Sequence, residues 1–254
     1  MKAMNFQKSL VSAVLPVYNE AACIMPVLTE LYRGVAFAER HEIIVVDDGS
    51  TDGSSTLINE FAVAHPGLRT LRLEPNAGQS AAFWAGIQAA TGDVIVLMDA
   101  DGQNDPADIA HLVSALDDAD IVCGYRVHRN DTFAKRAASR LANAVRRAIL
   151  HDAIRDTGCS LKAFKAPLIK PLQYWDGMHR FLPMLASLNG AKIVQIPVSH
   201  RGRMAGKSKY TNFGRLMRTV RDMRGVAWLQ SRTRRFAVMP TQGSLPADKH
   251  GEAD

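Results

Sequence analysis

The sequence is poor in cysteine and has no long apolar run. Its 254 residues include three cysteines, Cys23, Cys123 and Cys159. Their odd number and wide spacing exclude a disulfide framework and a zinc ribbon, so we expect reduced, mostly buried thiols of a cytoplasmic protein. No stretch reaches 18 consecutive apolar residues. A membrane-spanning helix is therefore not expected.

Two common nucleotide-binding signatures are also missing. Residues 11–17 predict a first strand, but no Gly-x-Gly-x-x-Gly follows it, and no Gly-Lys-Ser/Thr phosphate loop occurs. Because both signatures are missing, we predict that any nucleotide is held by carboxylates and a metal ion.

Lys2 and Lys8 precede the apolar run as they would in a signal peptide. The run is short and contains Pro16, so we expect a first strand there instead.

Charge is distributed unevenly along the chain. Of the 25 acidic residues, 17 lie in residues 1–125, whereas 25 of the 31 Lys and Arg residues lie after residue 125. The first half is thus suited to a cation and the second to anions. Nucleic acid, anionic lipid and a phosphorylated substrate all remain open as ligands of the second half.

Strands and helices are predicted to alternate through the first 125 residues. Apolar runs at 11–17, 42–46, 68–73, 94–98 and 121–125 predict strands, and helical patterns separate them. This alternation indicates a single α/β domain with a doubly wound, mainly parallel sheet. Such sheets bind ligands beyond the carboxyl ends of their strands, where the segments starting at Tyr18, Asp47 and Asp99 are expected.

The run at 94–98 ends in the segment Asp99-Ala100-Asp101-Gly102-Gln103. Carboxylates at i and i+2 point the same way on an extended chain, and the glycine lets the backbone turn. Two carboxylates and an amide oxygen suit a divalent cation that bridges phosphates. A solvated loop after a strand is the alternative interpretation.

Four segments together resemble a known family. Leu15-Pro-Val-Tyr-Asn-Glu20, Val46-Asp-Asp-Gly-Ser-Thr-Asp52, Asn76-x-Gly78 and Asp99-Ala-Asp-Gly-Gln103 are similar to family 2 glycosyltransferases. They are closest in character to the dolichol-phosphate mannose synthase group, polyprenyl-phosphate glycosyltransferases of the GT-A fold. The resemblance extends over residues 10–210.

The resemblance implies roles on the donor side. Residues implied to contact the nucleotide sugar are Pro16, Tyr18, Glu20, Asp47, Asp48 and Asp99. Those implied to surround Mg²⁺ or Mn²⁺ and the diphosphate are Asp99, Asp101 and Gln103.

On the acceptor side, the resemblance implies that the lipid phosphate is bound by Arg126, Lys135, Ser139, Arg203 and Lys207. Asp156 is implied to lie near the sugar, as the catalytic carboxylate. Two alternatives stay open, namely that Asp156 caps the turn at Gly158 and that the basic face of the predicted helix 133–150 is merely solvated.

The last part of the chain is basic. Residues 200–236 contain eleven Lys and Arg residues and one Asp. A helix over 212–230, with apolar and Arg residues alternating and Trp228 near its end, predicts an amphipathic element at a membrane surface. We divide the chain into a GT-A domain, 1–211, an interfacial helix, 212–236, and a disordered tail, 237–254.

The sequence therefore predicts a metal-dependent inverting transferase that moves a sugar from a nucleotide diphosphate to a polyprenyl phosphate. It would lie peripherally on the cytoplasmic face of the membrane, held by anionic lipid or by a membrane-embedded partner. The alternatives are transfer to a hydroxyl of a glycan or glycolipid, and a non-catalytic binder of nucleotide sugars or nucleic acid. No helix-turn-helix or stacked-aromatic signal supports nucleic acid.

Overall fold

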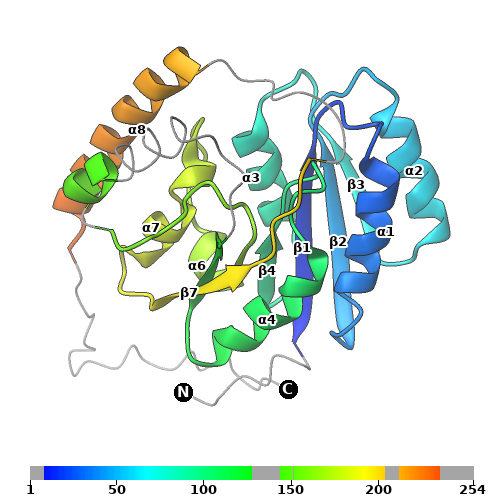
Figure 1. Cartoon of the computed structure of the whole chain (residues 1–254), viewed down its shortest axis with the longest axis horizontal. Coiled ribbons are helices and arrows are strands. Elements are labelled where there is room, and N and C mark those ends of the chain that lie inside the picture. The colour runs from blue at the N-terminus through cyan, green and yellow to red at the C-terminus, as the bar shows by residue number, and fades with distance from the viewer. Residues whose placement is uncertain (1–8, 128–143, 151, 204–211, 235–254) are drawn as a thin grey trace, which may run out of the picture.

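The structure, a computed structural model, describes residues 9–127, 144–150, 152–203 and 212–234, with side chains left out of the description at 212–218. Its centre is a seven-stranded sheet in the order β3-β2-β1-β4-β6-β5-β7 (Figure 1). The strands are β1 Leu10–Val17, β2 Arg40–Asp47, β3 Leu68–Arg72, β4 Val94–Leu97, β5 Ile121–Arg126, β6 Lys162–Lys165 and β7 Ile193–Val198.

Alternate side chains of the central strands enter two separate cores. On β1, Val11, Ala13, Leu15 and Val17 face one core with α1 (Ile24–Gly34), α2 (Ser54–Ala64) and α4 (Ile109–Ser114). Val14 of β1 faces the other, with α3 (Gln79–Ala89), α6 (Ala166–Ile169) and α7 (Leu182–Ser187). Because both faces of the sheet are covered, the central strands β1, β2 and β4 are mainly apolar. The predicted doubly wound α/β fold is confirmed.

The strands of the first half pair in parallel as predicted. β1 lies between β2 and β4, both parallel to it, and β3 extends the sheet beyond β2. α3 approaches β1 closely through Gly86, where an added Cβ would lie 2.3 Å from a methyl group of Val14. Short 3₁₀ turns, η1 (Pro106–Asp108), η2 (Ala115–Asp117) and η3 (Met178–Arg180), complete the connections.

Two strands were not predicted from the sequence. β6 lies antiparallel between β4 and β5, and β7 extends the sheet parallel to β5. β6 begins and ends in lysine, which interrupts the apolar pattern, and β7 contains Pro197 and is mostly half-buried. Both sequences therefore lack the continuous apolar run that marks the central strands.

The basic helix α8 (Asn212–Arg232) is present, and one side of it packs on the domain. Met223 and Val226 are buried in the core that contains α3 and α7, with Val220 and Ala227 against it. Trp228 is 63% exposed. Among the described helices, none is long and apolar enough to cross a membrane.

Candidate functional site

The loops after β1 and β2 lie together at the carboxyl edge of the sheet because Val17 pairs with Asp47 in the parallel register. The β1 loop is held by the segment after β2. Ser50 Oγ accepts from the Asn19 amide (2.9 Å), Asn19 Oδ1 accepts from the Thr51 amide (2.7 Å), and Ser54 Oγ accepts from the Glu20 amide (2.9 Å). Asn19 has a φ of 52° and Tyr18 is 38% exposed. These contacts fix the loop that carries Tyr18 and Glu20 beside β2, and Pro16, the third residue predicted to contact the nucleotide sugar, lies just before it in β1.

Asp47 and Asp48 are both buried, and each organises a different partner. Asp47 accepts from Arg72 Nη1 (2.5 Å) and from the Ser50 amide (2.9 Å). Asp48 accepts from Asn76 Nδ2 (2.9 Å) and from two backbone amides, those of Ala77 (2.8 Å) and Gly78 (2.9 Å).

The Asn76-x-Gly78 segment is thereby explained. Gly78 has a φ of 89°, a conformation that favours glycine and that aims its amide at Asp48. Burial raises the pKa of Asp48, the charge of Asp47 adds to the effect, and the hydrogen bonds from Ala77, Gly78 and Asn76 oppose it. Asp48 thus fixes the start of α3 at the sheet edge.

The Asp99–Gln103 segment follows β4 at the same edge. The Asp99 amide donates to Ser160 Oγ (3.1 Å), and Gln79 Nε2 donates to Asp99 Oδ1 (2.7 Å). Burial raises the pKa of Asp99 to about 6, and the neighbouring charge of Asp101 adds to this. Asp101 accepts from the Gln103 amide (3.1 Å) and from Arg203 Nη2 (2.8 Å).

A small cavity of about 30 Å³ joins this segment to the second half of the chain. Its lining consists of Asp99, Asp101, Gln103, Asn104, Arg126, Gly158, Cys159, Ser160 and His200. The volume suits one ion or water molecule. His200 and Ser160 were missed by sequence analysis, because a single histidine without ligand spacing and a serine carry no signal of their own. The backbone bridge between Asn104 and His200 brings the histidine here.

The donor set fits a cation that keeps waters and binds phosphate. No group of three His, Cys, Asp or Glu side chains among the described residues comes together as a complete metal cage. Asp99, Asp101 and Gln103 instead line the small cavity together. Mg²⁺ is commonly bound by one or two carboxylates with substrate phosphates completing the shell. The predicted set therefore suits a metal–diphosphate complex.

Arg126 and Asp156 form a two-pronged ion pair beside this cavity. Arg126 Nε donates to Asp156 Oδ2 (2.7 Å) and Nη2 donates to Oδ1 (2.8 Å). The amides of Arg126 (3.3 Å) and Gly158 (3.2 Å) also donate to the carboxylate. Asp156 thus caps the turn at Gly158 and also fixes the guanidinium. An added Cβ at Gly158 would lie 3.0 Å from Arg126 Nη2, so a larger residue there would press on the guanidinium.

The turn around Gly158 is held by two buried basic side chains, Lys162 and Arg146. The Lys162 ammonium is buried and donates to the carbonyl of Cys159. Arg146, on the helical residues 144–150, is also buried and donates to Thr157 Oγ1 (2.9 Å) next to Asp156. The predicted acceptor residues Lys135, Ser139 and Lys207 lie outside the described residues.

Comparison with known proteins gives consistent matches. The model of "Glycosyl transferase family 2" matches residues 12–170. An undecaprenyl-phosphate 4-deoxy-4-formamido-L-arabinose transferase of Enterobacter sp. (strain 638) is 38% identical over 221 residues, covering 84% of this chain and 66% of that protein. A dodecaprenyl-phosphate galacturonate synthase of Rhizobium johnstonii is 38% identical over 224 residues, covering 85% of this chain and 65% of that protein. The chain thus spans slightly less than two thirds of these relatives.

Solved structures share the fold. A glucosyl-3-phosphoglycerate synthase from Mycobacterium tuberculosis, in complex with Mn²⁺, uridine-diphosphate and phosphoglyceric acid, has a TM-score of 0.65 and 20% identity over 92% of this chain and 81% of that chain. A mannosyltransferase from Pyrobaculum calidifontis, in complex with GDP-Man and Mn²⁺, has a TM-score of 0.59 and 22% identity over 88% of this chain and 63% of that chain. The family model covers more than half of the sequence, and the residues that it matches include all four motif segments. This chain belongs to glycosyl transferase family 2.

Proposed function

We propose that the chain is a metal-dependent inverting glycosyltransferase that moves a sugar from a nucleotide diphosphate to a polyprenyl phosphate. One observation carries the proposal. The cavity lined by Asp99, Asp101 and Gln103 is also lined by Arg126, which is held by Asp156. A cavity that could hold the cation of a metal–diphosphate complex thus adjoins a fixed guanidinium that could bind a second phosphate.

On the donor side, the segment from Pro16 to Glu20 would bind the base and ribose, together with one or both of Asp47 and Asp48 at the end of β2. Asp99, Asp101 and Gln103 would hold Mg²⁺ or Mn²⁺, with His200 in the same cavity. Such an ion, when bound, neutralises charge on the departing diphosphate. Asp99 and Asp101 favour binding of this ion, because two adjacent carboxylates repel each other when no cation lies between them.

On the acceptor side, the chemistry needs cations more than a base. An oxygen of the acceptor phosphate would bond to the anomeric carbon as the bond to the diphosphate breaks, from the opposite side. A phosphate monoester has a second pKa near 6, so it is largely dianionic at neutral pH and has no proton to lose. Asp156 already accepts hydrogen bonds from Arg126 and Gly158. We assign it the positioning of Arg126 rather than proton removal.

Further acceptor contacts are proposed from the family resemblance. Arg203 would leave Asp101 and bind the acceptor phosphate together with Lys135, Ser139 and Lys207. Two similar relatives support a lipid phosphate as acceptor. One is named an undecaprenyl-phosphate formamido-arabinose transferase and the other a dodecaprenyl-phosphate galacturonate synthase.

The test is a transfer assay with purified protein. Nucleotide sugars of uridine and guanosine are incubated with Mn²⁺, Mg²⁺ or EDTA and a short polyprenyl phosphate. The same polyprenol without phosphate and a glycan serve as acceptor controls. We expect metal-dependent formation of a polyprenyl-phosphate sugar. Transfer to the glycan alone would favour the hydroxyl-acceptor alternative, and binding without turnover would favour the non-catalytic one.

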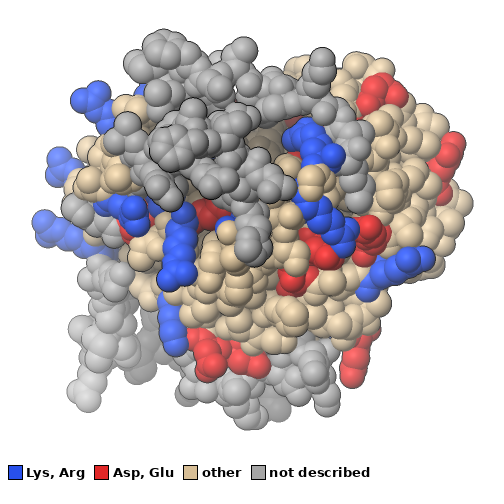
Figure 2. Space-filling view, viewed as in Figure 1, with Lys and Arg blue, Asp and Glu red and all other residues tan. Residues whose placement is uncertain are grey.

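We further propose peripheral attachment to the inner face of the membrane through α8. Its outward side carries Arg221, Arg224, Trp228 and Arg232, all exposed (Figure 2 shows basic side chains at the edge where Figure 1 places α8). Each basic residue near an anionic surface contributes about 1 kcal/mol. Because Met223 and Val226 face the core, we expect mainly electrostatic binding with Trp228 as an anchor.

Flotation with anionic vesicles tests this attachment. We expect binding at low salt that weakens as salt rises. Replacing Arg221 and Arg224 by Gln should reduce flotation, whereas the same change at Arg33 and Arg40, exposed arginines of the acidic half, should not. Equal flotation of both variants would contradict the proposal and favour a membrane-embedded partner.

A further inference from the structure

The segment after β7 lies along the loop that follows the metal-binding carboxylates. Asp108 Oδ2 accepts from the Ser199 amide (2.7 Å), and the carbonyl of Gln103 accepts from the Arg201 amide (2.9 Å). Between them, Asn104 and His200 form a backbone bridge. The two segments, nearly 100 residues apart in sequence, are therefore hydrogen-bonded to each other at this edge.

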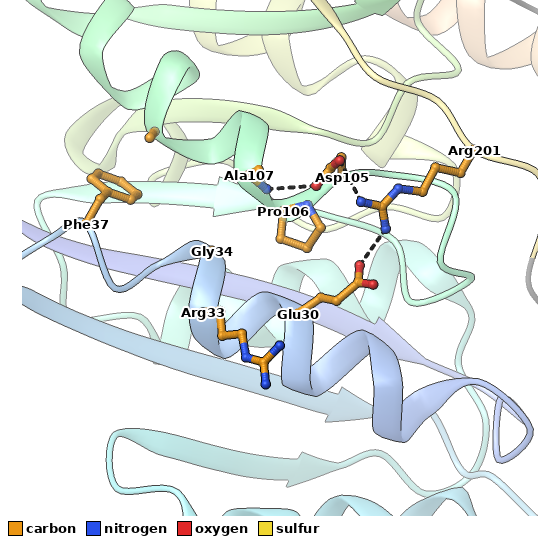
Figure 3. A pocket seen from close by; sticks show the side chains of 9 residues that line it. Glu30, Arg33, Gly34, Phe37, Asp105, Pro106, Ala107 and Arg201 are labelled. Atoms are coloured by element: carbon orange, nitrogen blue, oxygen red, sulfur yellow. Dashed lines mark hydrogen bonds and ion pairs between the residues drawn. The ribbon is translucent and has the colours of Figure 1, made fainter.

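Arg201 turns away from the cavity and joins two other elements. Its Nη1 contacts Glu30 Oε2 of α1 (2.6 Å) and its Nη2 contacts Asp105 Oδ2 (2.6 Å), as Figure 3 shows. Asp105 in turn caps η1, because its Oδ1 accepts from the Ala107 amide (3.1 Å). One guanidinium thus bridges a long helix and the loop beyond Gln103.

The sequence neighbours of Arg201 reach the site itself. His200 lines the cavity with Asp99 and Asp101, and Arg203 Nη2 contacts Asp101 Oδ2 (2.8 Å). The backbone amide of Gln103 donates to the same Asp101 carboxylate, and the Gln103 carbonyl accepts from the backbone amide of Arg201. The chain around Arg201 is therefore linked to the Asp101 carboxylate in two ways, through Arg203 and through Gln103.

The ion pairs of Arg201 are too exposed to matter much for stability. Its side chain is 40% exposed, and those of Glu30 and Asp105 are 36% and 23% exposed. Pairs of this kind add little to the free energy of unfolding. A planar guanidinium that contacts two carboxylates from different elements does fix orientation, which a lysine ammonium does not reproduce.

We propose that Arg201 is a positioning residue that holds Gln103 and His200 in place beside the cation and the diphosphate. The inference rests on the proposed function for the identity of the ligands. It concerns how the site is built, since Arg201 itself touches neither ligand.

Binding of Mn²⁺ tests this inference without requiring sugar transfer. Mn²⁺ is titrated by water-proton relaxation with and without uridine diphosphate for the wild type, Arg201→Ala and Arg201→Lys. A surface pocket of about 450 Å³ is lined by both Arg33 and Arg201, and Arg33 is exposed, so Arg33→Ala is the matched control (Figure 3). Glu30→Gln, on α1, removes one of the two carboxylates that Arg201 contacts.

We expect Mn²⁺ affinity to fall about 10-fold in Arg201→Ala, as for other residues that support metal ligands from outside. Arg201→Lys and Glu30→Gln should give intermediate losses, and Arg33→Ala none. The melting temperatures of all variants should agree within about 2 °C, since exposed pairs contribute little. In transfer assays, Arg201→Ala should raise KM for donor and acceptor more than it lowers kcat.

Equal Mn²⁺ affinity in Arg201→Ala and Arg33→Ala would overturn the inference, as would a loss fully accounted for by unfolding. A wild type that binds no Mn²⁺ under either condition would overturn its premise. An enzyme that binds Mn²⁺ and uridine diphosphate but transfers nothing to polyprenyl phosphate would refute the proposed function alone, and the Arg201 comparison would still be decided.

Discussion

Replacing Asp156 by Asn tests whether this carboxylate orients Arg126 or removes a proton. The side chains of Arg126 and Asp156 are 16% and 10% exposed, so the pair is largely shielded from water. Asn keeps one oxygen acceptor but turns an amide NH₂ group toward a guanidinium donor. The variant therefore loses one of two parallel charge-assisted hydrogen bonds and leaves the Arg126 charge without its counter-charge.

The size of the effect follows from this geometry. Removing one partner of a fully buried pair costs about 3–5 kcal/mol. Because this pair borders a cavity, we expect the free energy of unfolding of Asp156→Asn to fall by about 2–3 kcal/mol, less than the fully buried case. Urea denaturation measures this, and Asp117→Asn, at an exposed carboxylate, is the control with an expected change near zero.

The pH dependence separates the two roles. A positioned general base contributes about 10²–10⁴-fold, and its loss is relieved as rising pH ionises a hydroxyl acceptor. If Asp156 only orients Arg126, transfer by Asp156→Asn should be lowered by a similar factor from pH 6 to 9. Arg203→Ala should lower transfer to polyprenyl phosphate more than it lowers slow hydrolysis of the donor.

The result that would refute this reasoning is also specific. A steep recovery of Asp156→Asn with rising pH, together with a nearly silent Arg203→Ala, would indicate a hydroxyl acceptor and a catalytic base. Both variants should be assayed with the short polyprenyl phosphate and with a glycan, at several pH values and at fixed ionic strength.

Three further changes test the metal site and the packing of the sheet. Asp101→Asn should abolish Mn²⁺-dependent transfer yet leave the melting temperature nearly unchanged, and retention of wild-type turnover would contradict the metal assignment. Glu42→Gln should destabilise the fold by about 2 kcal/mol, since Glu42 is a buried carboxylate that accepts charge-assisted hydrogen bonds. Burial raises the pKa of Glu42, but hydrogen bonds from Ser12 and Thr91 and the charge of Arg69 outweigh this and lower it below 4.5. The stabilisation from Glu42 is therefore present above pH 4.5 and is lost as the pH falls through the lowered pKa. Denaturation at pH 7 and pH 3 should show that the stability difference between wild type and Glu42→Gln is smaller at pH 3. Gly86→Ala should cost about 1–3 kcal/mol despite the higher helix propensity of Ala, because the methyl group meets Val14, and an unchanged midpoint in urea would show that α3 shifts freely.

The first half of the fold was predictable because its signals are local. Each central strand is a short apolar run, and each ends in polar residues that sequence analysis placed at one edge. The motifs at Asp48, Gly78 and Asp99 are local as well, so their positions in the structure agree with expectation. Their individual roles in binding stay predictions.

The second half was less predictable because its contacts are not local. The pair Arg126–Asp156 joins residues 30 positions apart, and the contact between Arg203 and Asp101 spans 102 positions. Nothing in either sequence neighbourhood specifies the partner. The helix α8 presents a different difficulty, since an apolar stripe with arginines is the same pattern whether it covers a protein core or a bilayer. Here Met223 and Val226 face the core.

The antiparallel strand β6 explains how the two halves share one site. In a parallel sheet, the loop before a strand lies at the edge opposite to the ligands. β6 runs the other way, with Lys162 paired to Leu97 at the end of β4, so the loop that precedes it reaches the ligand edge. Ser160 there accepts from the Asp99 amide, and Asp156 meets Arg126 at the end of β5. β7, parallel to β5, brings its carboxyl end and then His200 to the same edge. Reversal of one strand thus brings residues of the acidic first half and of the basic second half of the chain onto one cavity.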